Sequence, residues 1–213
     1  MKQILFFTLM VLASLSMQAQ HKKSSNAVFD CTLRGGVNLC QIDGDGAGHY
    51  NKIGFNAGVN TTFPLSQDDE GLRMLVEIGL TQKGSHISRE SIDKRIALTY
   101  VEIPLMLTYT MMEWRIGAGF APAILAKSNV TQWGEYDYVS SNNYRRMDPL
   151  PFCCEVQYMG ENHWGASLRF YDSMFNMSKS STGTYRCLFG NPNTIWSTGQ
   201  FNRLITGSVC YRF

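Results

Sequence analysis

The chain ends in thirteen residues, from Phe201 to Phe213, in which apolar and polar side chains alternate. Successive side chains of a β-strand point to opposite faces, so this segment predicts a strand with one apolar and one polar face. A membrane β-barrel requires such a strand where its last strand meets lipid and pairs with the first. We expect the apolar face to carry Phe201, Ile205, Gly207, Val209, Tyr211 and Phe213, and the polar face to carry Asn202, Thr206, Ser208 and Arg212.

The opposite end of the chain has the three-part layout of a secretory signal. Lys2 precedes an apolar stretch from Ile4 to Leu15, and small and polar residues follow as far as Gln20. The stretch is too short for a membrane-spanning helix, which needs about 20 apolar residues. We predict a signal peptide over residues 1–20, a short linker over residues 21–27 and one barrel domain over residues 28–213.

Charge and cysteine usage exclude some classes of function. Nineteen basic and seventeen acidic residues give a net charge of +2, too balanced for a protein that binds nucleic acid through its phosphates. The six cysteines lack the C-x-x-C pairs of zinc sites and thioredoxin-like sites. Unpaired apolar filler is favoured for them over a disulfide framework, which stays open for Cys31, Cys40, Cys153, Cys154, Cys187 and Cys210.

Eight segments between Val28 and Phe213 alternate in this way, and their lengths suit the roughly 9 to 11 residues with which a tilted strand crosses a bilayer. They predict an all-β fold, an eight-stranded antiparallel up-and-down transmembrane barrel. The segments are 28–40, 52–64, 72–84, 96–110, 113–127, 151–159, 163–174 and 200–213.

The two faces of these segments differ in charge. The outward set of three of them is predicted as Leu72, Met74, Val76, Ile78 and Leu80; Val101, Ile103, Leu105, Leu107 and Tyr109; and Trp114, Ile116, Ala118 and Phe120. The charged residues expected to point into the lumen are Arg34, Arg73, Glu77, Glu102, Arg115, Glu155, Arg169 and Arg212. An eight-stranded lumen is just wide enough for side chains to fill it, so a plug of ion pairs is favoured over a proton or ion path.

A soluble sandwich or a lipocalin-like carrier would invert these faces, and alternation alone does not choose between the two arrangements. The aromatic residues favour the membrane barrel, because eight of them lie on the apolar face at strand ends beside short turns or chain termini, like an interfacial girdle. They are Phe29, Phe63, Tyr109, Trp114, Tyr158, Trp164, Tyr211 and Phe213.

Connection lengths also alternate. Short links are expected at 66–71, 111–112 and 160–162, and longer polar ones at 41–51, 85–95, 128–150 and 175–199. Bacterial barrels have short periplasmic turns and longer external loops. This pattern predicts an integral outer-membrane protein with both termini in the periplasm. Pro104 lies inside a predicted strand and removes a backbone donor, so we expect a bulge at or next to it.

Several short motifs resemble the PorT-like outer-membrane β-barrel family from about Thr32 to Phe213. They are Gly36-Val37-Asn38, Gly54-Phe55-Asn56-Ala57-Gly58, Gln82-Lys83-Gly84, Tyr100-Val101-Glu102-Ile103-Pro104-Leu105, Gly117-Ala118-Gly119 and the final aromatic residue. The resemblance implies an eight-stranded outer-membrane barrel. The family's founding member takes part in secretion of surface and secreted proteins, and that role does not extend to every member.

The sequence offers few candidates for chemistry. Ordinary surface histidines are favoured over metal ligands for His21, His49, His86 and His163, and a flexible loop is favoured over a calcium site at Asp43 to Gly48. We predict no catalytic, cofactor-binding or metal-binding residue, and no cofactor. The one candidate for a lipid-modifying enzyme is His86 with Ser85 or Ser88, which lacks a located acid.

We therefore expect a non-enzymatic outer-membrane protein with a structural or adhesive role, or a role as an accessory to surface-protein secretion. The alternatives are an outer-membrane lipid hydrolase or acyltransferase and a secreted lipocalin-like carrier. The expected partners are outer-membrane lipid, the barrel-assembly machinery through the C-terminal strand, and an extracellular or secretion-system protein.

Overall fold

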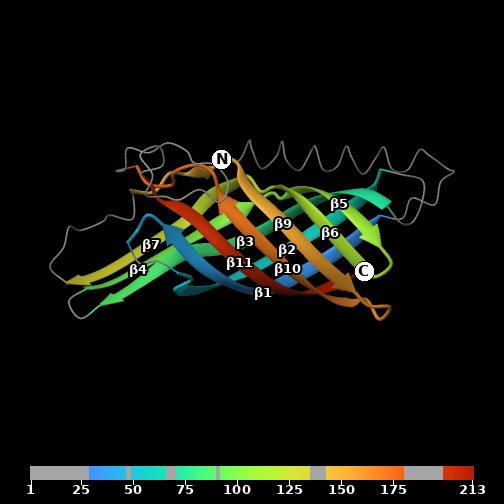
Figure 1. Cartoon of the computed structure of the whole chain (residues 1–213), viewed down its shortest axis with the longest axis horizontal. Helices are drawn as coiled ribbons and strands as arrows, with labels where there is room; N and C mark the ends of the chain where they lie inside the picture. Colours follow the sequence, from blue (N-terminus) through green and yellow to red (C-terminus); the bar gives the residue numbers. More distant parts are fainter. Residues whose placement is uncertain (1–28, 47–48, 66–70, 90–91, 135–142, 180–198) are drawn as a thin grey trace.

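A closed wall of β-strands forms the described part of the chain in the computed structural model (Figure 1). The structure describes residues 29–46, 49–65, 71–89, 92–134, 143–179 and 199–213, so the predicted signal peptide and linker lie outside the described residues. This part of the chain holds no helix with the length and apolar character of a membrane span. Its strands are β1 (Asp30–Asp43), β2 (Lys52–Pro64), β3 (Gly71–Arg89), β4 (Ile92–Glu102), β5 (Leu105–Met111), β6 (Trp114–Phe120), β7 (Ala123–Gly134), β8 (Met147–Asp148), β9 (Pro151–Met159), β10 (Trp164–Ser173) and β11 (Phe201–Arg212).

These strands make a ring of eight antiparallel membrane-crossing segments. Three of these segments each consist of two consecutive strands that continue one another, namely β4 with β5, β6 with β7, and β8 with β9. The chain runs up and down around the ring, and β11 pairs with β1 from Thr32 opposite Arg212 to Asp43 opposite Phe201. Both ends of the ring are therefore joined by hydrogen bonds, and the predicted eight-stranded barrel is confirmed.

Pro104 and Pro122 interrupt their strands without changing the register between β3 and β4–β5, or between β4–β5 and β6–β7 where they meet. Glu77 donates its backbone N–H to the Pro104 carbonyl at 3.0 Å, and Ile103 donates to the Pro122 carbonyl at 2.9 Å. The β3 pairing keeps the same offset in β4 and β5, so the bulge predicted at Pro104 is wrong. One register shift lies instead between Thr99 and Tyr100, where β4 meets β7. A second lies between the β6–β9 pairing, which ends at Phe120 opposite Phe152, and the β7–β8 pairing, which begins at Ala123 opposite Asp148. Each proline removes one donor from a pair whose other hydrogen bond remains, which requires no extra residue.

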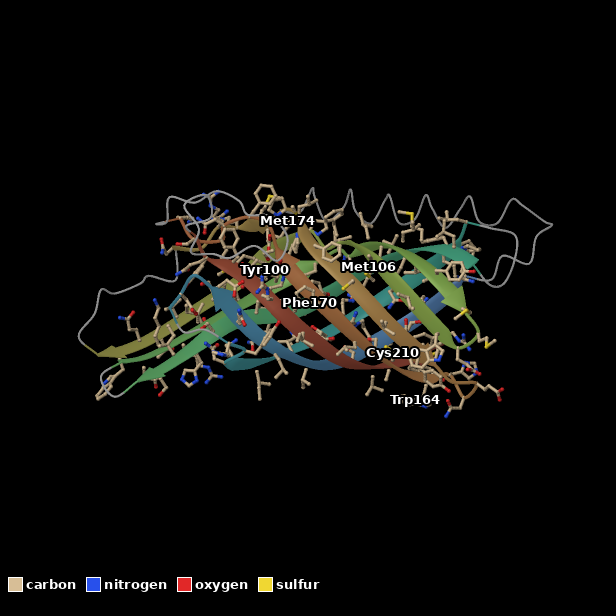
Figure 2. All side chains as sticks on the ribbon, viewed as in Figure 1. Tyr100, Met106, Trp164, Phe170, Met174 and Cys210 are labelled. Carbon is tan, nitrogen blue, oxygen red and sulfur yellow. The ribbon has the colours of Figure 1, made fainter. Side chains whose placement is uncertain are left out.

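The two faces of the wall follow the predicted alternation through most of its height. Leu72, Ile78, Leu107 and Ile116 are exposed on the outside, while the inward positions of the same strands are buried. Apolar outward rows and buried charges exclude the lipocalin-like carrier, whose apolar residues would face its interior. Figure 2 shows side chains on both faces of the wall, with Trp164 at the end where both termini of the ring lie.

The eight predicted girdle residues gather at that end, which we call the turn end because short links such as Met112–Glu113 join its strands. The rings of Trp114 and Tyr158 lie 5.1 Å apart, and those of Trp164 and Tyr211 also lie 5.1 Å apart. Outward aromatic residues are not confined to this rim. Others lie at higher levels of the wall, namely Phe55, Phe120, Phe152 and Phe170.

The opposite end, the loop end, departs from the prediction in two ways. Phe201, expected on the outer face, is fully buried, because protein covers it there: the backbone of Gly199 lies against its ring. The long connection predicted at 85–95 is largely strand, since β3 reaches Arg89 and β4 begins at Ile92, and the one predicted at 128–150 begins with strand, since β7 reaches Gly134. These parts form a three-stranded projecting sheet, residues 85–89, 92–98 and 127–134, which rises beyond the rest of the wall (Figure 1).

Candidate functional site

Four charged side chains from different strands meet at the centre of the barrel. Arg169 of β10 is 0% exposed, and its Nη2 lies 2.7 Å from Oε2 of Glu77 on β3. It also pairs with Glu155 of β9, to which its Nε donates at 2.6 Å. Arg34 of β1 lies 3.4 Å from Glu77 and 3.6 Å from Glu155. We call Arg34, Glu77, Glu155 and Arg169 the ionic layer, which holds two positive and two negative charges.

A second buried ion pair lies beside this layer. The Nζ of Lys83 is 2.6 Å from Oε1 of Glu102, and Thr81 donates its hydroxyl to the other Glu102 oxygen at 2.9 Å. Lys83 also lies over the rings of Tyr100 and Tyr171, at 5.1 and 5.4 Å from their centroids. Sequence reasoning did not place Lys83 in the lumen, although it is six residues from Glu77 on the same strand and therefore on the same face.

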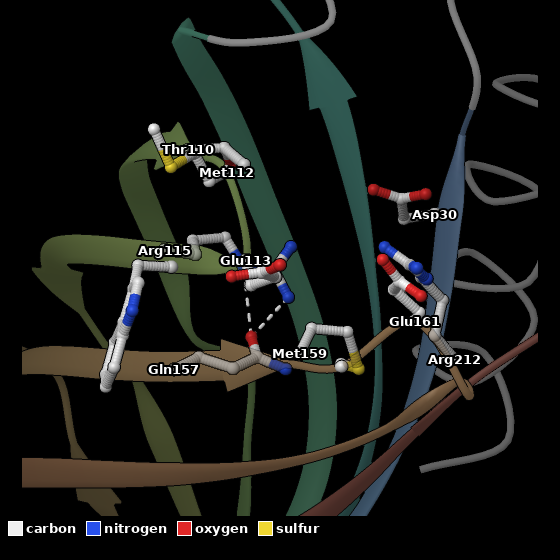
Figure 3. A pocket seen from close by; sticks show the side chains of 11 residues that line it. Asp30, Thr110, Met112, Glu113, Arg115, Gln157, Met159, Glu161 and Arg212 are labelled. Carbon is white, nitrogen blue, oxygen red and sulfur yellow. Dashed lines mark hydrogen bonds between the residues drawn. The ribbon is translucent and has the colours of Figure 1, made fainter.

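The turn end holds a small polar pocket with a volume of about 140 Å³ (Figure 3). Arg115 and Arg212, the two predicted lumen charges that are only partly buried, line it together with Glu113 and Glu161. Arg115 donates its Nε to Gln157 Oε1 at 2.9 Å, and Asp30 pairs with Arg73 at 3.2 Å nearby. Pockets for substrates usually measure about 300 to 1,000 Å³, so this space suits water molecules better than a substrate.

An apolar cluster closes the loop end of the interior. We call this cluster the apolar cap; it consists of Ile42, Ile96, Leu98, Tyr100, Ala123, Tyr144 and Met177. Backbone hydrogen bonds hold its irregular parts, from Arg145 N–H to the Met177 carbonyl and from Met177 N–H to the Gln200 carbonyl, at 2.8 and 2.9 Å. Burial raises the pKa of Tyr144 to about 12, with a smaller contribution from the charge of Asp45. The cap and the layers below it fill the described interior, which fits the predicted plug of ion pairs better than a path for ions.

The residues proposed for lipid chemistry lie on the projecting sheet but do not form a triad. His86 Nε2 lies 2.9 Å from Asp93 Oδ1, so the structure supplies an acid that the sequence did not locate. Ser85 is buried on the other face and accepts a hydrogen bond from Asn51 at 3.0 Å. Among the described hydroxyl groups, including that of Ser88, none hydrogen-bonds to the His86 ring. This arrangement lacks an activated nucleophile.

Cysteines and possible metal ligands add no further site. The five described cysteines, Cys31, Cys40, Cys153, Cys154 and Cys210, are free, as the filler interpretation predicted, and Cys187 lies outside the described residues. No three His, Cys, Asp or Glu side chains in the described ranges are grouped as metal ligands. Asp43, part of the sequence considered as a calcium loop, pairs with Arg203 at 3.2 Å.

The outer face of the projecting sheet is polar and carries a large aromatic residue. Cross-strand pairing places four rows on this face, the first of them at the base of the sheet: Gln82, Thr99 and Lys127; Gly84, Ala97 and Asn129; His86, Arg95 and Thr131; and Ser88, Asp93 and Trp133. Trp133 is 78% exposed, compared with 47% and 55% for the girdle residues Trp114 and Trp164. Sequence reasoning missed this surface because residues 85–95 and 128–134 are rich in Ser, Asn and Asp and were predicted to be loops.

Comparison with protein families identifies the class of this barrel protein. Residues 18–179 match the outer membrane protein beta-barrel domain family, which covers more than half of the chain. The chain belongs to this family. Membership shows an outer-membrane β-barrel protein, as predicted, whereas the narrower PorT-like assignment stays a prediction.

Solved structures with low sequence identity resemble this outer-membrane β-barrel protein. Ail, the attachment invasion locus protein of Yersinia pestis, was solved in complex with the heparin analogue sucrose octasulfate. Its match has a TM-score of 0.43 at 11% identity and covers 87% of this chain and 99% of Ail. Neisserial surface protein A matches with a TM-score of 0.48 at 9% identity, over 86% of this chain and 97% of its own. No curated protein sequence matches the chain.

Proposed function

We propose that this outer-membrane barrel is a non-enzymatic surface anchor that presents the projecting sheet to a binding partner outside the cell. The observation that carries the proposal is the contrast between a filled interior and an exposed tip. Arg169 is fully buried in the ionic layer, while Trp133 stands 78% exposed on a sheet that is held by two strand pairings. Exposed Trp residues are frequent anchors of protein interfaces.

The height of the lipid-facing band supports an external position for this sheet. A strand tilted by about 40° rises about 2.5 Å along the barrel axis per residue. The ten steps from Tyr109 to Thr99 then span about 25 Å, which equals the usual height of the apolar band. Residues 92–98 of β4 lie beyond that height, and the exposed residues among them, Asp93 and Arg95, are polar.

The proposal includes an orientation, with the loop end outside the cell and both termini in the periplasm. Short links lie at the turn end, and bacterial barrels keep short turns on the periplasmic side. A peptide tag inserted between residues 137 and 138 is expected to bind antibody on intact cells. A tag between Met112 and Glu113 is expected to bind only after permeabilisation. The reverse labelling pattern would contradict the orientation.

The adhesive role is tested by attachment of cells that display the chain to immobilised host-cell and bacterial surfaces. Trp133→Ala is expected to reduce attachment by tenfold or more, because truncation of a Trp anchor costs roughly 2 kcal/mol or more of binding free energy. Met112→Ala is the matched control, because Met112 is equally exposed, at 78%, but lies at the turn end. Equal attachment of both variants and of a strain without the chain would refute the adhesive role.

The enzymatic alternative makes a different prediction. If the pair of His86 and Asp93 served lipid chemistry, His86→Ala would change the acyl or headgroup composition of outer-membrane lipids. We expect lipid analysis of the His86→Ala strain to match that of the parent. A role in surface-protein secretion would instead appear as a loss of secreted proteins on deletion of the chain, and no contact in the structure favours it.

A further inference from the structure

Exposed basic side chains lie just above the apolar band at the loop end. We call Arg95, Lys127, Arg145 and Arg146 the basic rim, and each of the four is exposed. Lys127 belongs to β7, Arg95 to the neighbouring β4, and Arg146 directly precedes β8. Leu125 donates its N–H to the Arg146 carbonyl at 2.8 Å, which fixes Arg146 beside the part of β7 that carries Lys127.

The apolar band ends directly below this rim. Ile124 of β7 pairs with Met147 of β8, and these two outward side chains are 51% and 59% exposed. Lys127 follows Ile124 by three residues and Arg146 precedes Met147 by one. At about 2.5 Å of rise per residue, both cations emerge within about 8 Å of the last apolar row, where lipid headgroups meet acyl chains.

The rim has no counter-charge of its own. No ion pair joins its four cations to a carboxylate within the described ranges, whereas Arg34, Lys83 and Arg169 in the interior are all paired. Asp93 is the one exposed carboxylate that the structure describes at the loop end, and it contacts His86. The exposed carboxylates described at the other end are Glu113 and Glu161. Among the exposed charged side chains that the structure describes, cations therefore predominate at the loop end and carboxylates at the turn end.

We propose that the basic rim binds the phosphate groups of lipopolysaccharide, the phosphorylated glycolipid of the outer leaflet. The proposal rests on the orientation given under Proposed function. Lipid A carries phosphates on its sugars next to the acyl chains, so a ligand held against the apolar band brings its phosphates to the level of Lys127 and Arg146. Charge-assisted hydrogen bonds from Lys and Arg to phosphate are strong, and Arg can bind it with two parallel bonds.

The surface of β7 between the levels of Lys127 and Arg95 suits the sugar part of the same ligand. Asn129 and Thr131 are exposed on β7, in line with Lys127, and offer uncharged donors and acceptors for hydroxyl groups. The binding surface is thus continuous with the lipid-facing band below it. That continuity favours a membrane glycolipid over a soluble acidic polymer or a protein partner.

The test uses the folded full chain in zwitterionic detergent, with diphosphoryl lipid A as the probe and native mass spectrometry as the measurement of affinity. The double variant Lys127→Gln/Arg146→Gln is expected to bind lipid A about 25-fold more weakly, from about fivefold per cation at an anionic membrane surface. The conservative variant Lys127→Arg/Arg146→Lys is expected to keep the parent affinity. Arg212→Gln, a basic residue of the turn end, is the control and is expected to change nothing.

A second arm separates phosphate recognition from general lipid binding. Dephosphorylated lipid A is expected to bind the parent chain as weakly as diphosphoryl lipid A binds the double variant. Equal affinity of the parent for both lipids, or an unchanged affinity of the double variant, would overturn the proposal. Preference for a soluble anionic polysaccharide over lipid A would also overturn it. Reversed tag labelling with lipid A binding intact would refute the orientation alone, because the affinity measurement needs no membrane.

Discussion

The ionic layer and the apolar cap fill the same cylinder with opposite chemistry. Within the lipid-facing band, β3 and β4 turn Glu77 and Glu102 inward, and Ile78 and Leu80 of β3 point outward. Beyond the band, β4 turns Ile96 and Leu98 inward, and Asp93 and Arg95 outward. β4 therefore follows the membrane rule below and the rule of water-soluble proteins above, and the surrounding solvent decides which of its side chains lie inside. On β3, Lys83 and Ser85, opposite Leu98 and Ile96, remain polar and buried. The change falls between Glu102 and Leu98.

The largest expected effect is the loss of Arg169, which joins the two carboxylates of the ionic layer. Arg169→Met leaves Glu77 and Glu155 with Arg34 as their remaining partner, and is expected to lower the free energy of unfolding by about 3 to 5 kcal/mol. Urea unfolding in lipid vesicles measures it. The double variant Arg169→Met/Glu155→Gln restores the charge balance and should lose less than the single variant. A larger loss in the double variant would contradict the layer as one charge-balanced unit.

The apolar cap is tested by Leu98→Ala, which removes a fully buried side chain. We expect a cost of about 2 to 5 kcal/mol, because the change leaves a cavity, with the damage confined to the loop end. Amide hydrogen exchange should speed up in β4 and in residues 143–146 while heat resistance of the barrel is kept. Leu107→Ala, on the lipid-facing side, is the control, since acyl chains can fill the space. Equal exchange in both variants would mean that the cap contributes nothing.

The third prediction places an arginine on the lipid-facing side of the barrel and compares it with an arginine above the apolar band. Leu105→Arg is expected to lower stability by about 2 to 4 kcal/mol, because Leu105 is exposed on the lipid side about 10 Å inside the band, so an Arg there faces hydrocarbon near the bilayer midplane. Asn129→Arg, on the outward face above the band, should change stability by less than about 0.5 kcal/mol. Folded yield is measured from the mobility difference between heated and unheated samples. Similar yields would refute the assignment of the band.

Gly84 lies at the border between the ionic layer and the apolar cap, and its substitution is expected to have the smallest effect on stability. Its φ of +144° is strained for other residues, and a Cβ would lie 2.0 Å from the carbonyl oxygen of Ile96. Gly84→Ala is expected to lower stability by about 1 to 3 kcal/mol in a melting experiment in detergent. At Gly207 a Cβ would meet no atom within 4 Å, so Gly207→Ala should melt like the parent. If both variants melt alike, this border is not tightly packed.

Strand periodicity was enough to predict the ring and the inward position of Glu77 and Arg169, because a two-residue repeat fixes faces within one strand. It did not identify their contact, since the two residues are 92 positions apart and lie on strands whose approach depends on closure of the ring. Nor did it identify the pair of His86 and Asp93, because the residues between them were predicted to be a loop.

The upper part of β7 was missed for a related reason. Opposite Thr99 and Tyr100 the register shifts by one residue, so the exposed positions are even-numbered up to Ile124 and odd-numbered from Lys127. A count of alternate residues therefore fails at that point. Phe201 was predicted to face lipid but is buried, because protein covers the outer face there, and periodicity contains no information about that cover.

The projecting sheet also determines where this fold leaves strand edges open. β3 is paired with β2 as far as Thr81, and β7 is paired with β8 at Ala123 and Ile124. Beyond those pairs, the outer borders of the sheet have no strand partner among the described residues. In hydrocarbon, such backbone groups would cost several kcal/mol each, which is why membrane barrels close on themselves. Here the unpaired borders begin where water can solvate them, so the height of ring closure follows the thickness of the bilayer.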